Sequence, residues 1–132
     1  VPLLWKIHKL HHEETKLNAM ASLRTHFLES PIQAIIIGIP VSLITRMDIN
    51  TGIVFGILLL TWLFFAHSNI KIELGTLSKV ICGPQVHRIH HSIEKQHFNK
   101  NFAQYLPLFD ILFGTYCEPK KGEFPKTGLH TK

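Results

Sequence analysis

The pattern His-x-x-His-His occurs twice in this chain and accounts for six of its 10 histidines. Its members are His8, His11, His12, His87, His90 and His91. Residues spaced i, i+3 and i+4 share one face of a helix, so each copy would direct three imidazoles the same way. Neutral imidazole is a good ligand for first-row metals. Six such groups exceed the four ligands of a tetrahedral zinc site, and they therefore predict a centre with two metal ions.

Other polar residues near these triplets are weaker candidates. His67 borders the second apolar run of the chain and is expected to be a further ligand, because a histidine at the edge of a membrane helix is a functional candidate. Outer-sphere or additional ligand roles are considered for four more residues: His97, His26, Glu13 and Glu14. His130, in the C-terminal tail, is expected to play no part.

Two uncharged apolar runs cover residues 31–45 and 51–70 and predict two helices. The second is long enough to cross a bilayer, which takes about 20 apolar residues. The first, at 1.5 Å per residue, covers roughly 22 Å of a hydrocarbon core about 30 Å thick. The alternative is a soluble core hairpin, but little else in the chain could bury both helices.

The charges around these runs predict their orientation. Lys and Arg number four before the first run, one between the runs and nine after the second. This bias favours both flanks on the cytoplasmic side, so that the two triplets face one compartment. The expected fold class is therefore all-α, an integral-membrane helical hairpin with a cytoplasmic histidine-rich helical cap.

The C-terminal third is expected to contain one helix and a loose end. Aromatic and aliphatic residues recur at helical spacing over residues 101–116, which predicts an amphipathic helix that packs on the domain or lies at the lipid interface. Residues 118–132 are rich in Pro, Gly and Lys and are expected to be loose. Cys82 and Cys117 are far apart in the sequence and are expected to be free thiols.

Composition excludes several classes of protein. Charged residues make up only 17% of the chain and apolar residues 45%, which is unusual for a soluble domain of 132 residues. The net charge is +5, but the basic residues flank apolar runs rather than alternating with stacking aromatics, so nucleic-acid binding is not expected. The motifs of zincins, serine hydrolases and nucleotide-binding loops do not occur in the sequence.

Several segments resemble the fatty acid hydroxylase/sterol desaturase superfamily of membrane di-iron oxygenases. They are residues 4–12 (LWKIHKLHH), 65–69 (FAHSN), 87–92 (HRIHHS), 101–102 (NF) and 106–116 (LPLFDILFGTY). They cover nearly the whole chain in the family's order. The resemblance predicts one domain over residues 1–132, as a fragment that lacks the family's first histidine box.

The resemblance implies two iron ions held by a set of histidines beneath a membrane helical bundle. The ligands that match are His8, His11, His12, His67, His87, His90 and His91. With O2 as co-substrate, such a centre would hydroxylate or desaturate a membrane lipid, such as a fatty acyl chain or a sterol. Electrons would come from cytochrome b5 or from a ferredoxin with its reductase, and the protein would lie in a bacterial inner membrane or the endoplasmic reticulum.

Three other functions stay open at this point. A membrane zinc hydrolase would keep zinc and need neither O2 nor a reductant. A metal transporter or store would place ligands inside the apolar runs, yet residues 31–45 contain no His, Asp, Glu or Cys. A catalytically degenerate relative would keep the metal-binding residues without the activity.

Overall fold

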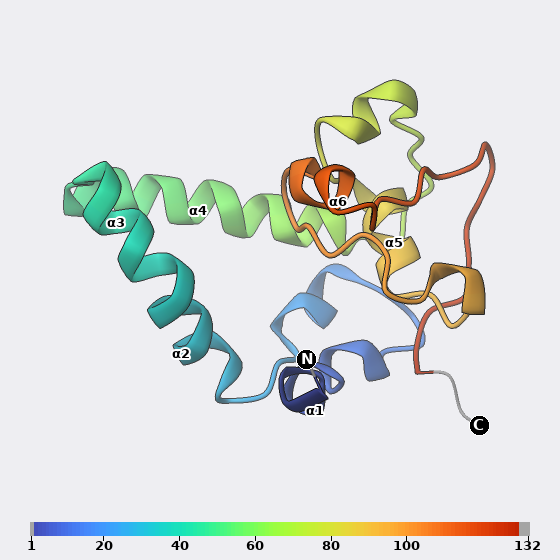
Figure 1. Cartoon of the computed structure of the whole chain (residues 1–132), viewed down its shortest axis with the longest axis horizontal. Helices are drawn as coiled ribbons and strands as arrows, with labels where there is room; N and C mark the ends of the chain where they lie inside the picture. The colour runs from blue at the N-terminus through green and yellow to red at the C-terminus, as the bar shows by residue number, and fades with distance from the viewer. Residues whose placement is uncertain (1, 130–132) are drawn as a thin grey trace.

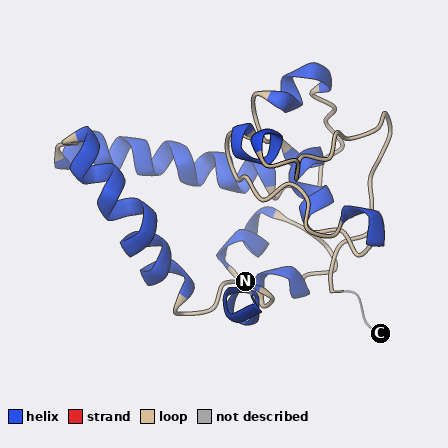
Figure 2. Ribbon diagram, viewed as in Figure 1, coloured by secondary structure: helices blue, strands red, loops and turns tan. Residues whose placement is uncertain are grey.

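The computed structural model describes residues 2–129, and this part of the chain is helical without a β-strand (Figure 2). Short helices and loops form a cap. Two long apolar helical segments extend from the cap and meet at their far ends (Figure 1). An isolated antiparallel bridge joins Ser92 to Thr127 inside the cap. The predicted all-α class is confirmed over these residues. Val1 and residues 130–132, including His130, lie outside them.

The first apolar run forms one helical arm that changes its hydrogen bonding in the middle. It consists of α2 (Glu29–Gln33), a π-helical turn (Ala34–Gly38) and α3 (Ile39–Thr45). Pro40 has no N–H and its ring crowds the preceding turn, so an unbroken α-helix is unfavourable here. The chain accommodates the proline with a wider turn, in which the Ile39 N–H donates to the Ala34 carbonyl five residues earlier. The arm begins two residues before the predicted 31–45 range.

The second apolar run forms α4, which covers Ile49–Ala66. Asp48 caps its start and accepts hydrogen bonds from the backbone N–H groups of Asn50 at 3.0 Å and Thr51 at 3.1 Å. The predicted range of 51–70 was too late at both ends. The helix ends at Ala66 because the Ser68 hydroxyl donates to the Phe65 carbonyl at 2.6 Å and the chain then becomes extended.

By length and composition α4 is the one described helix that could cross a membrane. Its mean hydropathy is 2.0 and only 6% of it is buried within the chain, unlike the core helix of a soluble protein. The arm over residues 29–45 is apolar but shorter. The two apolar helices meet at the turn near Arg46 and diverge from there (Figure 1). A packed membrane hairpin and its cytoplasmic orientation therefore stay predictions.

The interior of the cap is mostly polar. Its fully buried apolar side chains include Leu17 and Ile89, but buried histidines outnumber large aliphatic residues. The short helix α5 (Pro84–His90) lies at the centre and packs against the C-terminal end of α4. Buried imidazoles require hydrogen-bond or metal partners, so the stability of the cap depends on how those partners are provided.

The prediction of a continuous helix over residues 101–116 was wrong. Only α6 (Leu108–Leu112) is α-helical there. Asn101 has a left-handed backbone with φ of 53°, and Pro107 lacks the N–H that an unbroken helix would need. Apolar side chains in and after α6 face outward, since Phe109 on the helix and Phe113 just after it are 66% and 78% exposed.

The prediction of a loose tail was also wrong for the described residues up to 129. The buried Arg88 side chain on α5 donates to the Pro125 carbonyl at 2.7 Å and lies 3.6 Å over the Phe124 ring. The Thr127 hydroxyl donates to the Thr15 carbonyl at 3.0 Å. The composition of the segment does not reveal these contacts, because they are made by residues elsewhere in the sequence. Cys82 and Cys117 are free, as predicted.

Candidate metal centre

Three parts of the fold bring the predicted ligands together. His8 ends α1 (Pro2–His8), and His11 and His12 lie in the following 3₁₀ turn (His11–Glu13). His67 directly follows α4, at the point where the apolar helix enters the cap. The second triplet lies on α5 and its last residue caps that helix. The prediction that each triplet shares one helix therefore holds approximately for the second copy and not for the first.

Four imidazoles form a buried group, which we call the four-histidine group: His11, His67, His87 and His91. Their Nε2 atoms point at one another. His67 Nε2 lies 2.9 Å from His11 Nε2 and 3.0 Å from His87 Nε2. His91 Nε2 lies 3.1 Å from His87 Nε2. All four ligand atoms could therefore reach one ion.

The other three predicted imidazoles form the three-histidine group: His8, His12 and His90. His12 Nε2 lies 3.1 Å from both His8 Nε2 and His90 Nε2. The two groups are adjacent, since the rings of His12 and His91 are stacked with centroids 4.2 Å apart. All seven predicted ligands thus lie in one place, as a pair of neighbouring clusters.

Each triplet is divided between the two groups in the same way. Its first and last members, four residues apart, stay together, while the middle histidine crosses to the other triplet's pair. His8 and His12 are joined by His90, whereas His87 and His91 are joined by His11. This exchange links α1 to α5 through both clusters, so neither cluster can form from one triplet alone.

The hydrogen positions around these nitrogens show that the groups fit a cation. His67 Nδ1 is 2.9 Å from the Leu63 carbonyl, which only accepts, so Nδ1 carries the proton and Nε2 presents a lone pair. His90 Nδ1 is likewise 3.2 Å from the Lys100 carbonyl. The facing Nε2 atoms of the groups, 2.9–3.1 Å apart, can be joined by a proton on one of each pair or by a cation that lies between them. The Nδ1 atoms of His11, His87 and His91 would carry the protons if Nε2 bound an ion, and among the described residues no hydrogen-bond partner lies within bonding geometry of them.

Burial keeps these imidazoles in the neutral form that a metal needs. Loss of hydration lowers the pKa of His67 and of His90 to about 4, and of His12 to about 2. The same cause, together with neighbouring histidines, lowers the pKa of His87 and His91 well below the usual value. At neutral pH these five imidazoles are therefore neutral before any ion binds.

The stability of the metal-free protein should fall as the pH is lowered from 7.5 to 5.5. An unfolded histidine has a pKa of about 6.5 and gains a proton over this range, while a buried one with a pKa of about 4 does not. Each such imidazole then costs about 1.4 kcal/mol of folding free energy. Thermal unfolding followed by circular dichroism on chelator-treated protein measures this. A flat stability curve between these pH values would show that the imidazoles are not held neutral.

A carboxylate that the sequence did not single out supports the three-histidine group. Glu29, in the first turn of α2, is buried and its Oε1 lies 2.8 Å from His8 Nδ1. This contact directs Nε2 of His8 towards His12 and connects the cluster to the apolar arm. A carboxylate behind a ligand imidazole fixes the ring and raises its basicity. No periodicity or motif signals this role, because Glu29 lies 21 residues from His8 and precedes an apolar run.

Replacement of Glu29 by glutamine should weaken metal binding about 10- to 100-fold, the usual cost of losing an outer-sphere partner. The amide oxygen can still accept from His8 Nδ1, but the negative charge is lost. The matched control is Glu13→Gln, which changes an acid next to His12 in the sequence that pairs with Arg24 instead. Competition with a chromogenic chelator gives both affinities. Equal metal affinities for the two variants would show that Glu29 does not support metal binding.

The remaining candidates lie outside both groups. Glu13 and Glu14 pair with Arg24 at 2.8 and 3.7 Å. His26 accepts from the backbone N–H of Leu28 and stacks on Phe27. His97 is buried, with Nδ1 2.9 Å from the Ser92 hydroxyl and Nε2 3.3 Å from Glu123. Among the described residues no hydrogen bond or ring contact joins these four to the clustered nitrogens, so their ligand or outer-sphere roles stay predictions.

The spacing of the nitrogens allows metal coordination. Two ligands about 2.1 Å from an ion lie about 3.0 Å apart at a right angle and about 3.4 Å apart at the tetrahedral angle. The neighbouring Nε2 atoms of His11, His67 and His87 are separated by 2.9 and 3.0 Å, which is also the length of a hydrogen bond between two imidazoles. The separations therefore suit a first-row metal ion and do not by themselves select iron or zinc.

Comparison with known proteins gives an independent result. A sequence model described as fatty acid hydroxylase matches residues 1–115. An ornithine lipid hydroxylase of Rhizobium tropici is 26% identical, and the match covers 98% of this chain and 39% of that protein. Alkylglycerol monooxygenases of Danio rerio and Homo sapiens are 28% and 27% identical, over 87% and 88% of this chain and 25% of each relative.

Each match covers only part of the relative's chain. The chain spans between a quarter and two fifths of the length of these relatives, at 25% and 39%. No solved structure matches the chain significantly. The matched range over residues 1–115 contains all seven imidazoles of the two groups.

Proposed function

We propose, from the premise that this chain belongs to the fatty acid hydroxylase family, that it holds the di-iron centre of an O2-dependent enzyme that hydroxylates a membrane lipid. The relatives are named for hydroxylation and monooxygenation of lipids, which favours hydroxylation over desaturation. Because these relatives are only 26–28% identical to the chain, their names do not identify the lipid that this chain would bind. The predicted recognition of the family is confirmed by the match.

One observation carries the proposal: seven imidazoles converge into two adjacent groups of four and three. His11, His67, His87 and His91 would hold one iron, and His8, His12 and His90 the other. Iron in such a site can reduce O2 and supply an oxidant for an unactivated C–H bond, and imidazoles hold it without oxidisable thiolates. The protein's part is to position the ligands and to exclude water from the buried side.

A zinc hydrolase finds less support. A hydrolase needs a general base beside the metal-bound water. In the described structure the nearest carboxylate, Glu29, hydrogen-bonds to the rear nitrogen of His8 rather than entering the cluster.

A membrane location is supported by three features of the surface. α4 is apolar and mostly exposed except in its last turns, and the apolar arm over residues 29–45 is also mostly exposed. α6 adds exposed aromatic residues near the same end of the cap (Figure 1). Nine of the 14 basic residues follow α4 in the sequence, which favours a cytoplasmic cap. A lipid substrate would then reach the enzyme by diffusion within the bilayer.

The reaction also requires a partner. Hydroxylation with O2 takes two electrons from outside the substrate in each turnover, so the metal centre must be reduced again each time. We therefore propose that a soluble or membrane-bound carrier, such as cytochrome b5 or a ferredoxin with its reductase, delivers electrons from the cytoplasmic side.

The test is to purify the full chain anaerobically, measure its metals and assay it with 18O2. We expect two irons per chain and a lipid hydroxyl group that carries 18O from O2, formed only with a reductant. A product two hydrogens lighter without 18O would assign desaturation within the same class. Bound zinc with turnover in the absence of O2 would overturn the proposal.

A further inference from the structure

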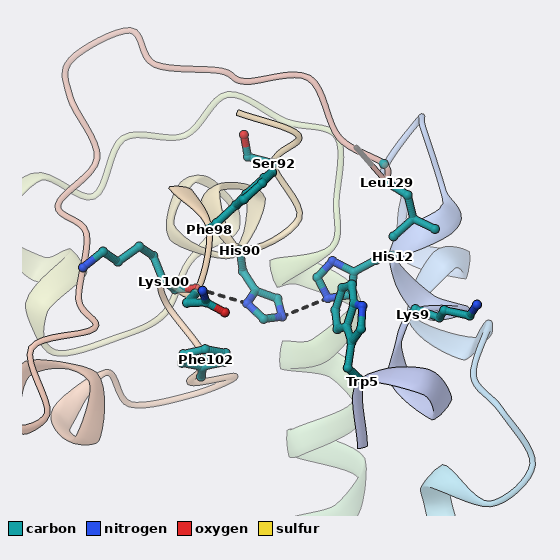
Figure 3. Close-up of a pocket in the computed structure, with 11 residues that line it drawn as sticks. Trp5, Lys9, His12, His90, Ser92, Phe98, Lys100, Phe102 and Leu129 are labelled. Carbon is teal, nitrogen blue, oxygen red and sulfur yellow. Dashed lines mark hydrogen bonds between the residues drawn. The ribbon is translucent and has the colours of Figure 1, made fainter. Parts of the chain in front are cut away.

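A cavity of about 510 Å³ opens beside the three-histidine group. His12 and His90 form its inner end (Figure 3). None of the four-histidine group lines it. The two clusters thus differ in access, because one is enclosed and the other has an open face. Metal sites that react with substrate keep an open position, whereas closed sites are structural or supporting.

Two aromatic rings flank this open face. The Trp5 ring lies 5.1 Å from the His12 ring, and the Phe102 ring lies 5.9 Å from the His90 ring. They come from opposite ends of the sequence and stand on either side of the two imidazoles (Figure 3). Each is about half exposed, at 47% and 56%. With Leu129 above them, they provide apolar walls that suit an alkyl chain.

The charges around the cavity are all positive. Lys9 and Lys100 line it, and none of its lining residues is an aspartate or glutamate. Their ammonium groups point outward, away from the imidazoles, on opposite sides of the cavity (Figure 3). Lys100 also donates to the exposed Gly114 carbonyl at 3.3 Å, which leaves its charge at the surface. A negative group at the rim would be attracted, whereas one at the inner end would lose hydration.

From these contacts we infer that the cavity binds an amphiphile with one alkyl chain and an anionic headgroup. The chain lies between Trp5 and Phe102 and ends at His12 and His90. The headgroup stays at the rim beside Lys9 or Lys100. The substrate position therefore belongs to the three-histidine group. This inference rests on the proposed function only for the reaction; binding itself requires neither iron nor O2.

Tryptophan fluorescence can test binding without any turnover. The chain has two tryptophans, Trp5 and Trp62, so Trp62→Phe leaves Trp5 as the only reporter. Trp62 lies on α4 and donates to the Cys82 carbonyl, away from the cavity lining, and circular dichroism checks that the variant is folded. The protein is loaded with zinc, which does not quench. The probes are a fatty acid and a fatty alcohol of equal length, each brominated near the chain end.

We expect saturable quenching of Trp5 by the brominated acid, reversed by the same acid without bromine. The alcohol should bind about 10-fold more weakly, and the double variant Lys9→Gln, Lys100→Gln should remove this difference, since each exposed charge contributes a few-fold. In the Trp5→Phe variant, the unbrominated acid should not reverse the remaining quenching of Trp62.

Two results would overturn the inference. Quenching that neither saturates nor reverses would show that Trp5 senses only bulk detergent or lipid. Equal affinity for the acid and the alcohol would show that the cavity does not select an anionic headgroup. Because the assay contains zinc and no reductant, its failure is distinct from failure of the iron and 18O2 experiment, which tests the proposed reaction alone.

Discussion

Replacement of His90 by alanine is expected to abolish lipid hydroxylation and to lower bound iron from two ions per chain to about one. His90 is the member of the second triplet that crosses to the first, and its Nε2 lies 3.1 Å from that of His12. Its loss leaves two imidazoles, His8 and His12, to hold an ion at the open face. The cost should exceed the 10- to 100-fold that removal of an outer-sphere partner causes.

The control for His90→Ala is a histidine outside both groups. His26 is partly exposed and contacts Phe27 and the backbone of Leu28, so His26→Ala should keep both irons and nearly full activity. Metal analysis and turnover are measured on both variants after the same anaerobic purification. Normal iron content and full activity in His90→Ala would refute the proposed ligand set.

The expected result depends on a grouping that the sequence could not provide. The repeated pattern identifies six ligand candidates, and the apolar run before His67 identifies the seventh. The pattern does not say which of these histidines share an ion. In the structure, His11 and His90 each cross from their own triplet to the cluster of the other. This exchange follows from how α1 and α5 approach each other, which is a property of tertiary packing and leaves no periodic signal.

The acidic residues illustrate the same limit. Glu13 follows His12 directly and was a reasonable outer-sphere candidate, but its side chain points to Arg24 at 2.8 Å. Glu29 is distant in sequence and contacts His8 because the apolar arm starts beside α1. On a regular helix, side chains three or four residues apart lie side by side, so spacing in the sequence predicts contact. It fails here because α1 ends at His8 and the chain turns.

The C-terminal segment shows how local chemistry can override periodicity. Apolar residues at helical spacing predicted a helix over residues 101–116, but buried polar side chains fold most of this segment into turns. Asp110 accepts from the backbone N–H groups of Phe102 at 3.0 Å and Ala103 at 2.8 Å. The Thr115 hydroxyl also donates to it at 2.6 Å. The pattern of apolar residues instead reflects a surface that faces outward over α6.

Asn101→Ala is expected to destabilise the protein by about 3–5 kcal/mol and to lower its metal content. The fully buried Asn101 side chain accepts from the Cys117 N–H at 2.7 Å and donates to the Cys117 and Val86 carbonyls at 3.0 and 3.2 Å. Alanine would leave one buried and two partly buried backbone groups without this partner, in a left-handed backbone that alanine adopts poorly. The neighbouring Lys100 carbonyl, which accepts from His90 Nδ1, would lose its fixed position.

Asn99→Ala separates the two causes of this loss. Asn99 has nearly the same backbone, with φ of 58° against 53° for Asn101, but it is exposed. Its replacement should cost only the backbone term, about 1 kcal/mol, and leave metal binding unchanged. Thermal unfolding and metal analysis of both variants test this. If the two variants lose equal stability, backbone strain accounts for the whole effect, and the side-chain bonds of Asn101 do not support the His90 side of the centre.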